Sequence, residues 1–251
     1  MNIIQSSTSM NSEPLKTSLL ETECLFGETV EILDKYLEWV YCKLLTDDYC
    51  GWIKKDSLGL LKIPTHRVLS KRTFLFHKKN IKSNCILYLP MGARLSVKQI
   101  KNEWAEIYLS NNYEYLIAFV PSKHIIEIDK NVKDWVSIAE QFIGTPYKWG
   151  GRDSMGIDCS ALVQLSYQAY GKNIPRNTSD QINAFKKKVE DVNKLDRGFV
   201  VFWEGHVGIM IDKLNCIHAN AYHMKTIVEP LNDIVKRMQN KYKIIKIINF
   251  N

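Results

Sequence analysis

The sequence lacks the features that would mark it as a membrane or secreted protein. No stretch approaches the roughly 18–20 apolar residues that a bilayer-spanning helix needs. Residues Met1–Ser9 have neither the basic start nor the apolar run of about 7–15 residues found in a secretory signal. We therefore expect no membrane span and a cytoplasmic location.

Cysteine and positive charge are present, but not in diagnostic patterns. Six cysteines in 251 residues have no metal-ligand spacing and do not form a disulfide framework, so reduced thiols are expected. The net charge of +7 (34 basic minus 27 acidic residues) is modest and forms no basic stripe with interleaved aromatics. The triplet Lys186–Lys188 is interpreted as a solvated helix face. Nucleic acid is therefore not an expected partner.

The first half of the chain has the pattern of a β-protein. Short runs that alternate between apolar and polar residues are separated by turns, with little helical periodicity, which predicts small β-barrels. The expected strands are Thr29–Leu33, Trp39–Leu44, Cys50–Ile53, Arg67–Val68, Thr73–Leu75, Arg94–Val97, Glu103–Tyr108 and Ala118–Val120.

Cys159 stands at a predicted helix start. From Asp158 to Tyr170 no residue breaks a helix, and Gly171 occupies the place of a left-handed C-terminal cap. The first helical turn favours an anion, because its N–H groups are unpaired and the helix dipole is positive there. Such a position lowers the pKa of a thiol from about 8.5 towards or below neutrality, so we expect a thiolate nucleophile.

Two histidines lie on predicted strands further along the chain. Residues 198–203 and 206–211 are interpreted as a buried hairpin, and residues 215–220 as a third strand. His206 and His218 therefore share a sheet. A cysteine at a helix start packed on such a sheet has the papain-like order of nucleophile, base and base-orienting residue. The other cysteines and histidines are interpreted as structural or surface residues: Cys24, Cys42, Cys50, Cys85, Cys216, His66, His77, His124 and His223.

Residues 134–251 resemble the NlpC-type papain-like peptidases of bacterial cell walls. The matching segments occur in the family's order and are Pro146-Tyr147-x-Trp149-Gly150-Gly151, Asp158-Cys159-Ser160, Pro175-Arg176-x-Thr178-x-x-Gln181, Gly205-His206-Val207-Gly208-Ile209 and Ile217-His218-Ala219. One position departs from the pattern, because Gly198-Phe199 stands where the family has Gly-Asp. That departure concerns the start of the strand rather than the catalytic residues.

The resemblance implies a role for each catalytic candidate. Cys159 would be the nucleophile, His206 the general base and acid, and His218 the residue that orients His206. Tyr147 and the backbone N–H of Cys159 would stabilise the oxyanion, although packing beside Trp149 is the alternative for Tyr147. No metal or organic cofactor is implied.

The first half resembles bacterial SH3-like domains. The first copy is carried by Leu25-Phe26-Gly27-Glu28, Trp39-Val40 and Asp48-Tyr49-Cys50-Gly51-Trp52-Ile53, and a weaker second copy runs from about Thr65 to Ile128. The expected fold class is α+β. Two small N-terminal SH3-like β-barrels, residues 1–62 and 63–130, would precede a papain-like α+β peptidase domain, residues 131–251.

The resemblance also predicts a groove that the first barrel closes at one end. Such a groove would admit a short murein-derived peptide with a free N-terminus. Asp158 and Ser160 are candidate ligands for its ammonium, since a carboxylate gives a charge-assisted hydrogen bond. Thr178 and Tyr49 are further candidates. The alternatives are a helix cap for Thr178, in a capping box with Gln181, and barrel packing for Tyr49.

These expectations converge on a cysteine endopeptidase. It would cleave the γ-D-glutamyl–diamino acid bond of short murein peptides during cell-wall recycling. A hydrolase of intact peptidoglycan, a non-catalytic wall-binding protein and an acyl transferase remain alternative hypotheses. The presence of Cys159, His206 and His218 argues against the non-catalytic one.

Overall fold

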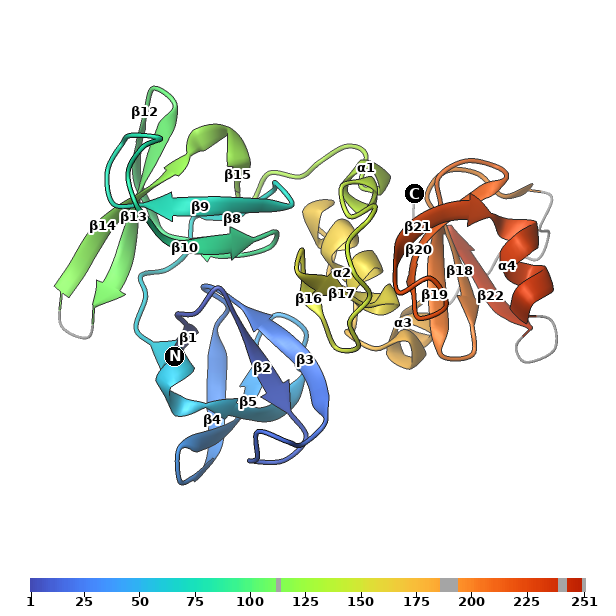
Figure 1. Cartoon of the computed structure of the whole chain (residues 1–251), viewed down its shortest axis with the longest axis horizontal. Helices are drawn as coiled ribbons and strands as arrows, with labels where there is room; N and C mark the ends of the chain where they lie inside the picture. Colours follow the sequence, from blue (N-terminus) through green and yellow to red (C-terminus); the bar gives the residue numbers. More distant parts are fainter. Residues whose placement is uncertain (112–113, 186–193, 239–242, 250–251) are drawn as a thin grey trace. The chain divides into compact units, whose positions relative to one another are not determined.

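The chain folds into two compact units, Met1–Asn131 and Val132–Asn251 (Figure 1). The computed structural model describes residues 1–111, 114–185, 194–238 and 243–249, so the triplet Lys186–Lys188 lies outside the described residues. Many strands and few helices confirm the α+β class. Within the described ranges, no helix is long and apolar enough to cross a membrane.

The first half of the first unit is a five-stranded antiparallel sheet with a small second sheet. The strands of the larger sheet are, in spatial order, β3 (Leu20–Leu25), β2 (Ser7–Asn11), β6 (Cys50–Lys54), β5 (Trp39–Leu44) and β4 (Val30–Tyr36). β1 (Asn2–Ile3) pairs with β7 (Leu58–Gly59) after the 3-10 turn η1 (Lys55–Ser57). Apolar side chains such as Met10, Leu44 and Ile53 are buried between them. Among the described residues the strand pairing does not close into a ring, so this half is an open version of the predicted barrel.

The second half of the first unit repeats this organisation. Its larger sheet contains β10 (Cys85–Pro90), β9 (Arg72–Phe76), β14 (Glu114–Pro121), β13 (Trp104–Asn111) and β12 (Val97–Lys101). Its smaller sheet contains β11 (Arg94–Leu95), β8 (His66–Val68) and β15 (Ile125–Glu127), which follows the 3-10 turn η2 (Ser122–His124).

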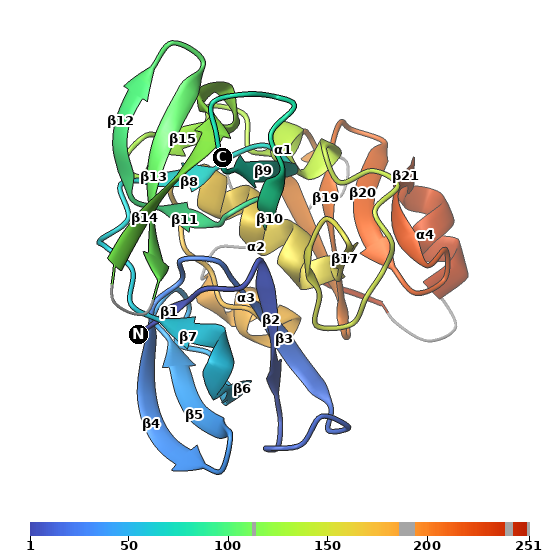
Figure 2. The ribbon, with the colours of Figure 1, turned by 60° about the vertical axis from the view of Figure 1, so that its left-hand side comes forward.

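The two halves of the first unit (Figure 2) contact each other through the turn that follows β3. Phe26 is buried in the core of the second half, and the Arg94 amide donates to the Phe26 carbonyl at 2.8 Å. Gly27 follows with a φ of +77°, and a Cβ there would lie 2.0 Å from the Arg94 carbonyl oxygen. Only glycine fits this close approach of two backbones.

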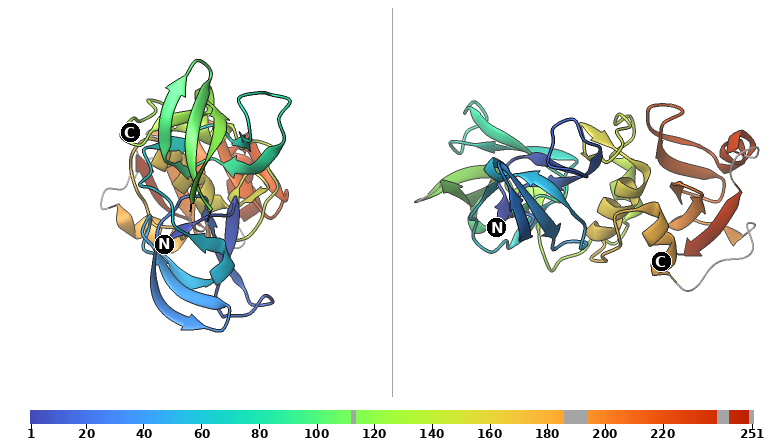
Figure 3. Two further views of the ribbon diagram at one scale, coloured as in Figure 1. Left: turned by 90° about the vertical axis from the view of Figure 1, so that its left-hand side faces the viewer. Right: turned by 90° about the horizontal axis from the view of Figure 1, so that it is seen from below.

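The second unit places helices against a five-stranded antiparallel sheet. The strand order is β21 (Lys225–Pro230), β20 (Asn215–Asn220), β19 (His206–Met210), β18 (Phe199–Trp203) and β22 (Ile244–Asn249). α2 (Cys159–Ala169) packs against β19 and β20, and α4 (Leu231–Met238) follows β21 and packs against it (Figure 3). The remaining elements are α1 (Val136–Glu140), β16 (Arg152–Asp153), β17 (Gly156–Ile157) and α3 (Thr178–Ala184).

The elements expected around the catalytic residues are confirmed. α2 ends at Tyr170 as its C-cap, and Gly171 has a φ of +82°. β18 is buried along its whole length, and Gly205, with a φ of +68°, makes the tight turn into β19. A continuous apolar run and a glycine turn therefore place His206 at the start of a core strand.

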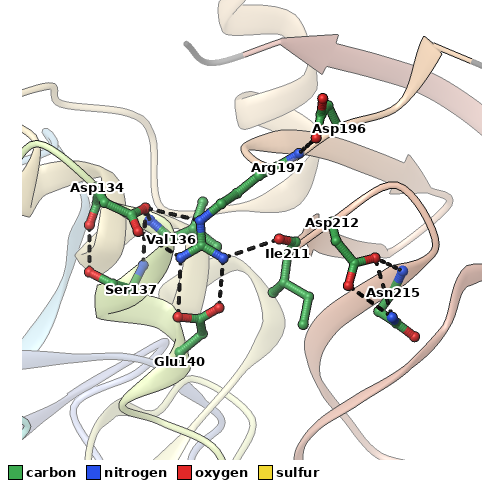
Figure 4. A network of polar contacts seen from close by, with 9 residues as sticks. All are labelled: Asp134, Val136, Ser137, Glu140, Asp196, Arg197, Ile211, Asp212 and Asn215. Atoms are coloured by element: carbon green, nitrogen blue, oxygen red, sulfur yellow. Dashed lines mark hydrogen bonds and ion pairs between the residues drawn. The ribbon is translucent and has the colours of Figure 1, made fainter.

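Arg197 holds the turn that precedes β18 (Figure 4). Its guanidinium donates to Asp134 at 2.7 Å, to Glu140 at 2.7 Å and to the Ile211 carbonyl at 3.1 Å. Phe199, where the family has Asp, is a buried residue at the start of β18. The strand start is thus fixed by these ion pairs and by apolar packing.

Candidate active site

Asp158 positions the nucleophile by capping α2. Its Oδ1 accepts the Ala161 amide at 2.8 Å, and its backbone is extended, as an N-cap requires. Cys159 is therefore the first helical residue. Asp158 Oδ2 also accepts the Gly150 amide at 3.0 Å, which ties the preceding loop to the helix start.

Arg176 completes the surroundings of the Asp158 carboxylate. It donates to Oδ1 at 3.0 Å and to Oδ2 at 2.6 Å, and both side chains are buried. Ser160 belongs to the same network, since its hydroxyl donates to Asp158 at 3.2 Å and accepts from Arg176 at 2.8 Å. Both flanking candidates for ammonium binding are thus engaged in a buried ion pair that fixes the start of the helix. A substrate ammonium would compete with Arg176 for this carboxylate.

The Cys159 thiol is buried, which favours its neutral form. Burial, followed by the Asp158 charge, raises its pKa to about 11, against the lowering effect of a hydrogen bond with the Val207 backbone. The predicted lowering of this pKa is therefore wrong for the free protein. The helix start is present as predicted, but loss of water around the sulfur outweighs it.

The two predicted histidines form a direct pair. His206 Nε2 lies 2.7 Å from His218 Nδ1, and the rings are inclined at 62°. Burial, followed by the neighbouring His218 and Arg237, lowers the pKa of His206 to about 3. His206 is therefore a neutral base at physiological pH. Because Nε2 is bonded to His218, Nδ1 is the nitrogen that can accept a thiol proton.

The fold brings Cys159 to this histidine pair. α2 packs on β19 and β20, which carry the two histidines, and the Val207 backbone next to His206 bonds to the cysteine. Gly208, between His206 and Met210 on β19, leaves room for the side chains of β20, since a Cβ there would lie 2.5 Å from Cys216 Sγ. The three predicted catalytic side chains therefore share one buried site.

Tyr147 and Thr178 lie close to the nucleophile. Burial, then the proximity of Cys159 and Asp158, holds the pKa of Tyr147 well above its usual range. Thr178 Oγ1 is 4.0 Å from Cys159 Sγ. The capping-box alternative for Thr178 is wrong, because Asn177 is the N-cap of α3 and the Gln181 side chain donates to the Ser160 and Pro175 carbonyls.

Tyr49 lies in the first unit, immediately before β6. Its hydroxyl donates to Glu21 Oε2 at 2.9 Å, which places a carboxylate beside the candidate ligand. Glu21 was not predicted from the sequence. The same is true of Glu229, whose Oε1 is 2.7 Å from His218 Nε2. Neither acid belongs to a motif, but Glu229 stands eleven positions after His218 on the next strand of the sheet, a spacing that a predicted hairpin would have flagged.

No group of three or more His, Cys, Asp or Glu side chains in the described part of the chain is arranged to hold a metal ion. The chemistry available at the site is that of a thiol, a neutral imidazole pair and a phenol.

Comparison with known proteins finds matches to both halves of the chain. Residues 144–244 match the NlpC/P60 family, and residues 12–58 match the bacterial dipeptidyl-peptidase SH3 domain. A Bacillus subtilis protein named gamma-D-glutamyl-L-lysine dipeptidyl-peptidase is 26% identical over 80% of this chain and 73% of its own length. A Lysinibacillus sphaericus protein named dipeptidyl-peptidase 6 is 24% identical over 87% of this chain and 86% of its own.

A solved structure has the same fold. The crystal structure of an NlpC/P60 family protein from Bacillus cereus aligns with a TM-score of 0.80 at 20% identity, covering 92% of this chain and 94% of the other. The predicted order of an SH3-like region followed by a papain-like domain is therefore confirmed. The predicted boundaries at 62, 63, 130 and 131 stay predictions.

Proposed function

We propose that this chain, whose second unit contains a domain of the NlpC/P60 family of cysteine peptidases, hydrolyses the bond between γ-D-glutamate and a diamino acid in short murein peptides. The observation that carries the proposal is the buried site in which Cys159 opens α2 beside the His206–His218 pair. The names of the Bacillus relatives, which match both the SH3 and the peptidase parts, support the substrate class.

The proposed reaction uses an acyl-enzyme. Cys159 Sγ attacks the γ-carbonyl carbon while His206 Nδ1 takes the thiol proton. Collapse of the tetrahedral intermediate breaks the C–N bond, and the imidazolium gives its proton to the leaving amine. Water then attacks the thioester with His206 as base, which releases the γ-D-glutamyl product and restores the thiol.

The surroundings suit this sequence of steps. Tyr147 and the Cys159 backbone N–H are proposed to stabilise the oxyanion, and the raised pKa of Tyr147 keeps its phenol a donor. The raised pKa of Cys159 and the lowered pKa of His206 favour the neutral forms of both groups, so proton transfer is proposed to accompany the attack.

Recognition of a free N-terminus is proposed to involve Tyr49, Thr178, Asp158 and Ser160. The Tyr49–Glu21 hydrogen bond supports the first of these, because a carboxylate beside a phenol offers an ammonium two hydrogen-bond acceptors. Asp158 is proposed to act mainly through its charge, since Arg176 already occupies both of its oxygens. A role in recycling wall peptides in the cytoplasm is the setting we propose for this activity.

Product analysis by mass spectrometry tests the proposal. Purified tripeptide, tetrapeptide and intact sacculi are each incubated with the protein and with Cys159→Ala. Release of L-Ala-γ-D-Glu from the soluble peptides only, and only with the unaltered protein, is the expected result. Equal release from sacculi would favour the wall hydrolase, and no release from any substrate would favour the wall-binding protein.

A further inference from the structure

Four side chains from consecutive elements form a chain of hydrogen bonds behind the catalytic cysteine. His206 on β19 bonds to His218 on β20, and His218 Nε2 lies 2.7 Å from Glu229 Oε1 on β21. Arg237 on α4 donates to both carboxylate oxygens of Glu229, with Nη1 to Oε2 at 2.9 Å. The Arg237 guanidinium also lies 4.6 Å from the centre of the Tyr222 ring.

The charge of Glu229 is fixed by these partners. Burial raises its pKa, but the hydrogen bonds from Arg237 and His218 outweigh burial and bring the pKa to about 2. Glu229 is therefore an ionised carboxylate near neutral pH. Such a group only accepts hydrogen bonds, so His218 Nε2 must carry the proton in their contact.

The proton on His218 Nε2 then determines which nitrogen of His206 carries a proton. In neutral His218 a protonated Nε2 leaves Nδ1 as an acceptor, so His206 Nε2 donates to it. Neutral His206 with a proton on Nε2 carries its lone pair on Nδ1. That nitrogen is the one available to the Cys159 thiol.

We infer that Glu229, held by Arg237, is a positioning residue that sets the tautomers of His218 and His206 so that the base presents its lone pair to Cys159. The inference rests on the cysteine-peptidase chemistry proposed above. It assigns a positioning role to a half-buried ion pair that the five family motifs do not contain.

Asn220 offers His218 Nε2 a hydrogen-bond donor, which would favour the opposite tautomer. Its Nδ2 is 3.1 Å from His218 Nε2, and its Oδ1 accepts the His223 amide at 2.8 Å, so an N–H group faces the ring. Without Glu229 this donor would favour a lone pair on His218 Nε2. His218 would then donate from Nδ1, His206 would carry its proton on Nδ1, and the base could no longer accept the thiol proton.

Nitrogen NMR of the histidine rings tests the inference directly and needs no substrate. In protein labelled with ¹⁵N-histidine, both rings should be neutral and protonated at Nε2 near pH 7, with assignments from His206→Gln and His218→Gln. In Glu229→Leu both rings should instead be protonated at Nδ1. A wild-type His206 protonated at Nδ1 would overturn the inference, even if the enzyme cleaves murein peptides.

Kinetics give the second readout. Glu229→Leu should lose roughly 10²- to 10⁴-fold in kcat, the range for a lost supporting residue or a wrong tautomer, with KM little changed. Removing the competing donor in Glu229→Leu/Asn220→Leu should recover part of that loss. Lys236→Gln, at an exposed position on α4, is the control and should retain full activity.

The outcomes separate this inference from the proposed function. Unchanged kcat and unchanged tautomers in folded Glu229→Leu would overturn the inference while leaving the peptidase assignment intact. Failure of the wild-type protein to cut any wall peptide would overturn the proposed function, and the ring tautomers would still decide the arrangement inferred here. If Glu229→Leu does not fold, the wild-type spectrum alone carries the decision.

Discussion

Two opposing effects meet at Cys159. A helix start favours the thiolate, but a sulfur removed from water favours the thiol, and burial prevails here. The thiol is therefore a latent nucleophile that depends on His206 for its activation. In a preformed thiolate–imidazolium pair, by contrast, His206 would be charged, which its burial opposes.

This state predicts slow alkylation of Cys159 in the free protein. The rate of iodoacetamide modification should keep rising between about pH 7 and 10, because the pKa of the thiol is raised to about 11. Mass spectrometry of the digested protein measures each thiol separately, with exposed Cys85 as the reference. A rate that reaches its plateau at or below neutral pH would contradict this prediction.

Cys159→Ala should abolish peptide hydrolysis and leave the fold intact. The removed sulfur forms weak hydrogen bonds with Thr178 and the Val207 backbone, and alanine is the best helix former. We expect a thermal midpoint within a few degrees of wild type and no product. Measurable turnover by the purified variant would mean that another group is the nucleophile.

Burial of neutral His206 predicts acid sensitivity of the fold. Its pKa is about 3 in the folded protein and about 6.5 in the unfolded chain, so the unfolded state binds more protons between these values. Stability is therefore full above about pH 6.5 and is lost as the pH falls towards 3, by roughly 3–5 kcal/mol. Urea unfolding at several pH values should show a shallower decline for His206→Gln. Identical declines would show that His206 makes no such contribution.

At the residue scale, the candidate site residues that stand in short sequence motifs were predicted. Residues that reach the site only through tertiary packing were not. Cys159, His206 and His218 stand in short local patterns. Glu229 and Arg237 stand in none, since their meeting with His218 depends on the register of β21 and on how α4 packs. The ion pair between Asp158 and Arg176 was likewise missed, although both residues lie in matched segments.

At the scale of elements, the apolar runs around the candidate site were predicted, whereas the apolar strands β10 and β22 were not. α2 and the strands β18, β19 and β20 appeared close to their expected bounds, because the core selects continuous apolar residues there. β2 and β3 were missed, since Ser7–Asn11 and Leu20–Leu25 are rich in Ser, Thr, Asn and Glu. Pairing with neighbours, rather than their own propensity, makes these segments strands.

The start of α2 depends on one ion pair, which predicts a large structural cost when it is broken. Asp158→Asn should destabilise the protein by about 3–5 kcal/mol, because Arg176 would be left buried without its charge partner. Asp180→Asn on the exposed face of α3 is the control and should change stability by less than about 0.5 kcal/mol. Urea unfolding measures both. An Asp158→Asn variant as stable as the control would show that the ion pair adds no net stability.

At the scale of the whole molecule, the chain contains a β-rich first unit and a second unit that carries the candidate catalytic residues. The second unit contains the complete set Cys159, His206 and His218 together with Glu229 and Arg237. The first unit contains no part of this set, but it contains the Tyr49–Glu21 pair. The order of the units was predictable from the sequence, since strand patterns and catalytic motifs occupy different halves of the chain.

Selectivity for a free N-terminus is the property we expect the first unit to supply. Acetylating the amine of a short murein peptide should remove a charge-assisted hydrogen bond and cost about 1.5–3 kcal/mol, or roughly 10- to 150-fold in kcat/KM. In Glu21→Gln and Tyr49→Phe the free peptide should lose most of this advantage, while the acetylated peptide is cut at nearly the wild-type rate. Rates from competing free and acetylated peptides in one reaction measure the ratio directly.

Glu38→Gln, an exposed acid in the same half of the unit, should leave the ratio unchanged. A wild-type enzyme that cuts both peptides equally would remove the basis for amine recognition, and the hydrolase of intact peptidoglycan would become the better account of this molecule.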